Sequence, residues 1–93
     1  MKPGATDDVR DRVRRFIVDT FYVRDAADVA NGASLIASGL IDSTGVLELV
    51  TFLESEFGIV VAQHEMTPDN LETIERIAIF VAAKKSSGVR SAA

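Results

Sequence analysis

The fold is decided by residues 39–58, which read GLIDSTGVLELVTFLESEFG. Apolar residues recur in this stretch every three or four positions, so they would share one face of an α-helix. The predicted helix runs from about Ser43 to Phe57 and stops at Gly58, because glycine readily adopts the left-handed conformation that follows many helices. The residues expected to face the core are Val46, Leu49, Val50, Leu53 and Phe57.

Two further stretches show the same periodicity and predict two more long helices. The first covers about residues 7–22, and its inward residues are Val9, Val13, Phe16, Ile17, Thr20 and Phe21. The last covers about residues 73–85, with inward residues Ile74, Ile77, Ala78 and Val81. Thr6 and Thr73 are expected to cap these helices, since threonine accepts a hydrogen bond from the first free amides of a helix.

The connections complete an all-α bundle of three long helices and one short helix. The short helix is predicted to begin at Thr67-Pro68, because proline is accepted at the first helical position. Residues 59–61 are expected to be an extended, partly buried connection. Residues 23–42 form a long loop between the first two helices, held to the core by Leu35, Ile36, Leu40 and Ile41. Residues 7–85 are then one domain, flanked by flexible tails at residues 1–6 and 86–93.

Composition excludes several classes of function. The 93 residues include no cysteine and one histidine, His64, so disulfides, thiolate metal sites and a catalytic triad are not expected. Glu72 and Glu75 lie on a helical face opposite apolar residues and are expected to be solvating charges. No stretch approaches the roughly 20 apolar residues of a membrane span, and the charged start of the chain is unlike a signal peptide. We expect a cytoplasmic monomer with no metal ion and no catalytic residues.

Charge is distributed unevenly along the chain. Residues 42–75 contain eight acidic residues and no lysine or arginine, within a chain of net charge −4. Such a block repels nucleic acid and attracts basic protein surfaces. The arginines of the first helix are interleaved with aspartates, which predicts an ion-paired solvent face rather than a nucleic-acid site; they are Arg10, Arg12, Arg14 and Arg15, among Asp7, Asp8, Asp11 and Asp19.

Ser43 stands out because a serine at the start of a helix permits two interpretations. It is a preferred N-cap residue, so its hydroxyl could simply satisfy the first backbone amides. Those same free amides and the helix dipole also favour an anion on or beside the serine. Asp42 could take part in capping, or could help to hold a divalent ion during a phosphoryl transfer.

The surrounding motifs distinguish between the two interpretations. They are Gly39-Leu40-Ile41-Asp42-Ser43, then Glu48-Leu49-Val50, Leu53-Glu54 and Glu56-Phe57-Gly58-Ile59, and finally Thr67-Pro68-Asp69-Asn70-Leu71 with Thr73-Ile74 and Ile77. In sequence and spacing they resemble the acyl carrier protein family, from about Asp7 to Lys85. The resemblance implies that family's four-helix fold. Thr44, Gly45 and Ser55 depart from the common pattern, which implies a specialised carrier rather than a housekeeping one.

The resemblance also implies a cofactor and a function. Ser43 would carry a covalent 4′-phosphopantetheine arm derived from coenzyme A, with Asp42 in the same site. A free-standing carrier of this kind holds an acyl or aminoacyl group as a thioester for enzymes of fatty acid, polyketide or specialised lipid and secondary-metabolite biosynthesis. The lack of cysteine is consistent with this, because the arm brings its own thiol. The alternative within the family is an aminoacyl or peptidyl carrier loaded by a dedicated ligase.

The implied partners are a phosphopantetheinyl transferase, a loading ligase or transferase, and synthase or acyltransferase enzymes with basic docking patches. Helical geometry places a stripe of Ser43, Leu47, Thr51 and Glu54 beside the core face, with Glu48 and Phe52 further round. Leu47 and Phe52 are apolar, yet both are expected to turn away from the core. The predicted docking residues are Thr44, Leu47, Glu48, Thr51, Glu54 and Glu56. An alternative from another class is an acidic helical adaptor in which Ser43 is never modified.

Overall fold

The computed structural model describes the backbone of residues 5–92 and the side chains of residues 8–85. It contains four α-helices and two single turns of 3₁₀ helix, which are α1 (Ala5–Phe21), η1 (Ala26–Val29), α2 (Ser43–Phe57), η2 (Gln63–Glu65), α3 (Pro68–Leu71) and α4 (Ile74–Ala92). No strand forms in this part of the chain. The predicted all-α bundle, with three long helices and one short helix, is confirmed.

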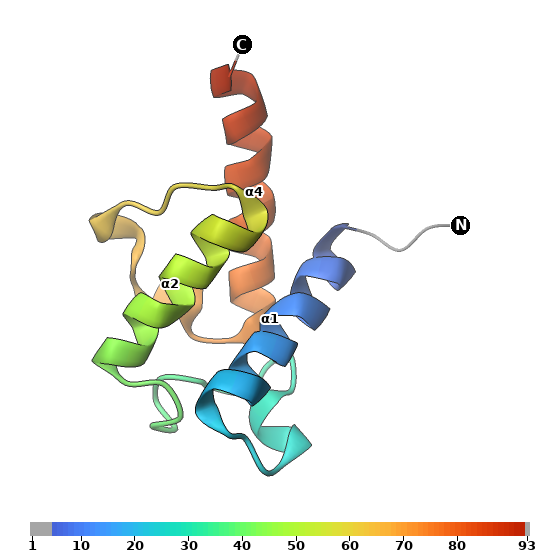
Figure 1. The fold of residues 1–93 in the computed structure, drawn as a ribbon, viewed down its shortest axis with the longest axis vertical. Coiled ribbons are helices and arrows are strands. Elements are labelled where there is room, and N and C mark those ends of the chain that lie inside the picture. The colour runs from blue at the N-terminus through green and yellow to red at the C-terminus, as the bar shows by residue number, and fades with distance from the viewer. Residues whose placement is uncertain (1–4, 93) are drawn as a thin grey trace.

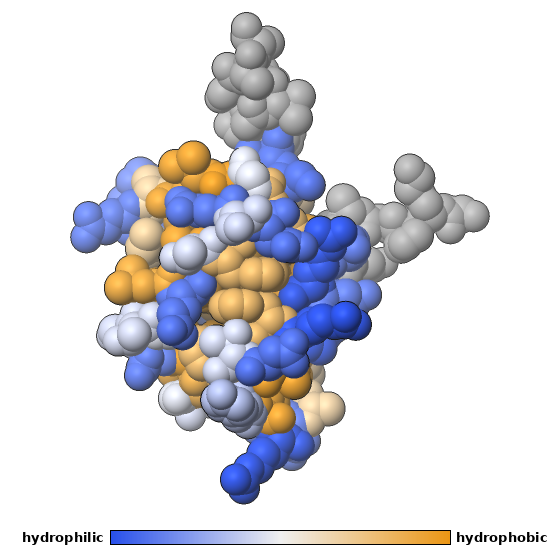
Figure 2. Space-filling view, in the orientation of Figure 1, coloured by the Kyte–Doolittle hydropathy of each residue, from blue (hydrophilic) through white to orange (hydrophobic). Residues whose placement is uncertain are grey.

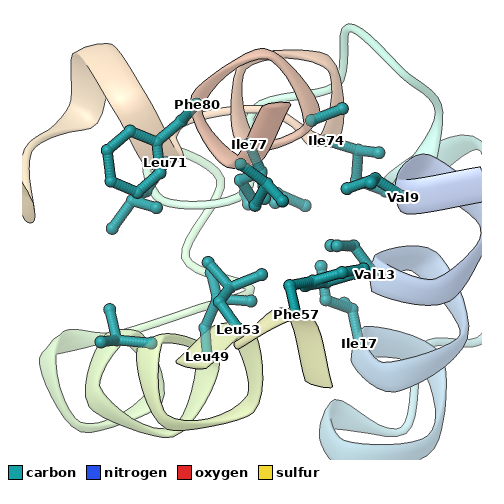
Figure 3. Packing of buried hydrophobic residues seen from close by; sticks show 14 of the residues in the cluster. Val9, Val13, Ile17, Leu49, Leu53, Phe57, Leu71, Ile74, Ile77 and Phe80 are labelled. Carbon is teal, nitrogen blue, oxygen red and sulfur yellow. The ribbon is translucent and has the colours of Figure 1, made fainter. Parts of the chain in front are cut away.

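The three long helices enclose one apolar core (Figure 1). Side chains from α1, α2 and α4 point toward one another in Figure 3, with Val13 and Ile17 facing Leu53 and Ile77. All four are fully buried, and no polar or charged side chain is buried among the described residues. The helical periodicity of the apolar residues therefore accounts for the packing.

Two helix ends differ from the prediction. Helix α1 begins at Ala5, so Thr6 lies inside it and is not its N-cap. Helix α4 continues to Ala92 instead of ending at Lys85. Relative to alanine, glycine lowers helix stability by only about 1 kcal/mol and serine by less than about 0.7 kcal/mol, so the residues after Lys85 do not by themselves end a helix. Residues 1–4 and 93 lie outside the described residues, and the flexibility of the two tails stays a prediction.

Other helix ends follow the predicted chemistry. The Thr73 hydroxyl accepts a hydrogen bond from the Arg76 amide at 3.0 Å and so caps α4. Gly58 ends α2 in the left-handed conformation, with φ of 67°. The connection at residues 59–61 forms neither helix nor strand and is partly buried as expected, since Ile59 and Val61 are buried while Val60 is 75% exposed.

The long loop between α1 and α2 is attached to the core at several points. Leu35 and Ile41 are fully buried, as predicted, and Ile36 and Leu40 pack against the core from partly buried positions. Hydrogen bonds also join the loop to the start of α4, because the Glu75 amide donates to the Asn31 carbonyl at 3.0 Å. These attachments lead the chain to a defined position at the start of α2.

Glu72 is one of these attachments, and its predicted role as a solvating charge is wrong. Its side chain is only partly exposed, and its carboxylate accepts hydrogen bonds from the Ser34 hydroxyl and from the Ala37 amide. Its backbone carbonyl accepts a third bond from the Leu35 amide at 2.7 Å. The Ser34 hydroxyl, followed by the Ala37 amide, lowers the pKa of the Glu72 carboxyl below its ordinary value.

Gly45 allows the end of α1 to approach the start of α2. A Cβ atom at this position would lie 2.8 Å from Cε1 of Phe21 and 3.0 Å from Cγ2 of Ile41. Both distances are shorter than ordinary van der Waals contact. Gly45 therefore has a packing role, which gives a physical reason for its departure from the family's common pattern.

Substitution of Gly45 by alanine tests this packing. We expect Gly45→Ala to lower the free energy of unfolding by about 1–3 kcal/mol, the usual cost of overpacking, despite alanine's higher helix propensity. Urea denaturation measures the effect. Gly32→Ala is the control, because a Cβ at Gly32 meets nothing within 4 Å. A Gly45→Ala variant as stable as the wild type would show that the close approach has no energetic consequence.

Glu72→Gln tests the attachment of the loop. The pKa of Glu72 in the folded chain lies below its ordinary value of 4.5, so the ionised carboxylate stabilises the fold at pH values above 4.5. This stabilisation is lost as the pH falls through the lowered pKa, because the carboxylate then becomes protonated in the folded chain as well. Urea denaturation should therefore show a less stable variant at neutral pH and a shrinking difference in acid. Glu75→Gln, at an exposed position on α4, should differ little from the wild type at either pH. An equal difference at both pH values would contradict the proposed role of the charge.

Candidate modification site at the start of helix α2

Asp42 is the N-cap of α2. Its backbone is extended, with φ of −95° and ψ of −172°, and its Oδ1 atom accepts a hydrogen bond from the Gly45 amide at 2.8 Å. Its backbone carbonyl accepts the first intrahelical bond, from Val46 at 2.9 Å. Of the two roles predicted for Asp42, the structure thus contains the capping role.

Ser43 is consequently the first residue inside the helix, and it does not act as the cap. Its side chain is exposed, and its hydroxyl has no hydrogen-bond partner in the part of the chain that the structure describes. The interpretation of Ser43 as a plain N-cap is therefore wrong. The sequence did not decide between adjacent Asp42 and Ser43, because both residue types cap helices well.

The position suits a phosphate group chemically. The first amides of α2 point out of the helix start, and the partial positive charge of the helix dipole is located there. A phosphodiester on the Ser43 oxygen would lie at this positive end, and the hydroxyl needed to form it is accessible. The residues present therefore fit a phosphopantetheine arm at Ser43, with Asp42 holding the helix start in place.

Four of the six predicted docking residues form one exposed strip along α2. Thr44, Leu47, Glu48 and Thr51 are all exposed, Leu47 to 58%. They line a shallow groove of about 570 Å³ between α2 and α1. The groove thus begins beside the candidate site, because Thr44 directly follows Ser43.

The other predicted docking residues make contacts within the protein. Glu54 is half-buried, and its carboxylate accepts a hydrogen bond from the Val61 amide at 2.8 Å. Glu56 is exposed and forms an ion pair with Arg12 of α1 at 2.8 Å. Glu54 therefore holds the connection after α2, whereas Glu56 lies at the far end of the groove from Ser43.

Phe52 lies between α2 and α1, so the expectation that it turns away from the packed side of α2 is wrong. Its ring stacks on Phe16, with centroids 4.2 Å apart and planes within 11° of parallel. Both rings are half-buried and line the groove. The sequence signal was present, since Phe16 belongs to the predicted inward stripe of the first helix and needs a partner on its neighbour.

The prediction of an ion-paired face on α1 is confirmed for two of its arginines, Arg12 and Arg14. Arg12 contacts Asp8 at 3.1 Å as well as Glu56, and Arg14 contacts Asp11 at 3.4 Å. Arg14 also donates from Nε to the Val29 carbonyl at 2.9 Å, which holds η1 against α1. Arg12 and Arg14 thus serve contacts within the protein, whereas Arg15 and Asp19 form no ion pair among the described residues. The Asp7 side chain lies outside the described residues.

The described residues contain no group of three His, Cys, Asp or Glu side chains placed to hold a metal ion. His64 is exposed in η2, as expected for a solvated residue. None of the helices described combines the length and the apolar character that crossing a bilayer requires.

Several curated proteins are similar to this chain in sequence over most of its length. A D-alanyl carrier protein of Streptococcus mutans is 31% identical over 70 residues, which cover 75% of this chain and 86% of that protein. A D-alanyl carrier protein of Streptococcus thermophilus is 34% identical over 61 residues, covering 66% and 76%. Aminoacyl carrier protein 2 of Bradyrhizobium diazoefficiens is 32% identical over 63 residues, covering 68% and 70%. No protein-family model matches the chain.

This chain belongs to the carrier protein family. Carrier proteins are not enzymes themselves. The reactions in which they take part are catalysed by the enzymes that modify and load them. The names of the relatives refer to D-alanyl and aminoacyl groups. Among the two predicted cargo classes, they agree with the aminoacyl alternative better than with the fatty acid or polyketide interpretation.

Because Asp42 caps α2 and Ser43 does not, substitutions at these two positions should change the stability of this carrier protein by different amounts. Asp42→Ala removes the cap and should lower the free energy of unfolding by about 1 kcal/mol. Asp42→Asn should keep most of the wild-type stability, because asparagine also caps helices well. Ser43→Ala should change the free energy of unfolding by less than about 0.5 kcal/mol, as is usual for a surface residue that does not cap a helix. Chemical denaturation compares the three. A loss for Ser43→Ala equal to that for Asp42→Ala would mean that the serine is the cap.

Proposed function

We propose that this chain is an aminoacyl carrier protein whose Ser43 bears 4′-phosphopantetheine. The observation that supports this most directly is the Asp42 cap, because it leaves the Ser43 hydroxyl exposed at the positive end of α2. When bound, the arm would supply a thiol that holds the aminoacyl group as a thioester. The chain itself contributes an accessible hydroxyl, a fixed helix start and a surface for partners.

Three kinds of partner follow from the proposal. A phosphopantetheinyl transferase would attach the arm, a ligase would load an amino acid, and an acceptor enzyme would remove it. We propose that they dock on the exposed strip formed by Thr44, Leu47, Glu48 and Thr51. Glu48 supports this, because its carboxylate is exposed and has no ion-pair partner among the described residues. Glu54 does not belong to the proposed surface, since it holds Val61.

The first test is intact-mass measurement after incubation with coenzyme A and a broad-specificity phosphopantetheinyl transferase. We expect the wild type to gain one phosphopantetheine and Ser43→Ala to gain none. Ser55→Ala, which removes another exposed hydroxyl of α2, should gain one like the wild type. No gain by the wild type would favour the unmodified adaptor. Hydroxylamine should release the cargo from the chain recovered from its own cells as an amino acid hydroxamate, and a fatty acyl hydroxamate would overturn the aminoacyl assignment.

A further inference from the structure

The hollow between α1 and α2 is longer than the docking strip alone. A second hollow adjoins the first and shares with it Phe16, Phe52 and Glu56. Figure 2 shows apolar surface at the junction of the two helices with hydrophilic residues on both sides. We call the combined feature the aromatic groove, because the stacked rings of Phe16 and Phe52 form its floor.

The length of the aromatic groove matches that of the proposed arm. Its α2 side extends from Thr44 to Glu56, and a helix of that many residues rises by about 18 Å. An extended phosphopantetheine contains about as many in-line bonds as five extended residues, which span about 17 Å. A group attached at Ser43 could therefore run along the groove and end near Glu56.

The groove also offers suitable chemistry along its length. Half-buried Phe16 and Phe52 present apolar surface for the methyl and methylene groups of the arm. Hydroxyl groups of Thr20, Thr44 and Ser55 line the walls and can exchange hydrogen bonds with its two amides. Apolar surface with a few polar groups is the usual composition of a site for a small ligand.

Charge in the groove favours one class of cargo. Five carboxylates and two guanidinium groups line the two hollows, a net charge of −3. At the end distant from Ser43, one guanidinium, of Arg12, is shared by the carboxylates of Asp8 and Glu56. A cationic group complements this surface, and aromatic rings also attract an ammonium. An aminoacyl thioester carries such an ammonium, which is costly to bury in an apolar core but not in an open groove.

We infer that the aromatic groove is the resting site of the arm, and that its Glu56 end accepts the ammonium of an aminoacyl cargo. This inference rests on the proposed function, since it requires an arm on Ser43. Ser55 lies on the α2 wall of the groove but outside the proposed docking strip, and its side chain is exposed. A large side chain at Ser55 should therefore block the groove without disturbing Ser43 or the surface on which the transferase docks.

The test compares amide chemical shifts of the ¹⁵N-labelled chain before and after the arm is attached. Two coenzyme A analogues are used, carrying alanyl or propionyl through a stable amide link, and intact mass confirms attachment. We expect shift changes across the groove, at Phe16 and Thr20 of α1, in addition to those beside Ser43. The alanyl form should also move amides near Arg12 and Glu56 more than the propionyl form does, and high salt should reduce that difference.

Two matched variants provide the control. Ser55→Arg should reduce the α1 shift changes by about half or more, while Val60→Arg, at an exposed position that does not line the groove, should leave them unchanged. Changes confined to the neighbours of Ser43, or unaltered in Ser55→Arg, would overturn the resting site. Equal responses to alanyl and propionyl would overturn the ammonium assignment. Failure of the wild-type mass to increase would instead refute the proposed function, so the two failures are distinguishable.

Discussion

The hydrogen bond from the Gly45 amide to the Asp42 carboxylate determines where α2 begins. Because Asp42 occupies the cap position, the helix starts one residue later and the next side chain, Ser43, points into solvent without a partner among the described residues. A serine that capped its own helix would have its hydroxyl engaged with the backbone. The division of roles between two adjacent residues thus gives the carrier protein both a stable helix start and an accessible hydroxyl.

The position of that helix start depends on contacts from both sides. Gly45 lies close to Phe21 and Ile41, so the end of α1 and the end of the long loop meet at the first turn of α2. Further back, the loop is attached by buried Leu35 and by hydrogen bonds to Glu72. Such fixed geometry suits the modification proposed for Ser43, because little conformational freedom is then lost when a partner docks.

Much of this fold could be predicted from the sequence, because the apolar residues of α1, α2 and α4 that recur at helical spacing are either buried or, like Phe16, Phe21 and Val46, packed against the core from partly buried positions. Phe80 of α4 is also buried, although it is not among the predicted inward residues. The end of α4 could not be predicted, since Ser and Gly weaken a helix without stopping it. At the site, periodicity placed Leu47 on the exposed side correctly but misplaced Phe52, whose burial depends on Phe16 of another helix. Glu54 and Glu72 were misjudged for a related reason, because their partners lie 7 and 38 residues away in the chain.

The most direct test of the central claim is a through-hydrogen-bond scalar coupling between the Gly45 amide nitrogen and the Asp42 side-chain carboxyl carbon. It should be measured by NMR before and after phosphopantetheine is attached. If Asp42 caps α2 and leaves Ser43 free to be modified, the coupling is present in both forms. A coupling absent from the unmodified chain, or lost when the arm is attached, would show that Ser43 takes part in the cap and would contradict the separation of roles.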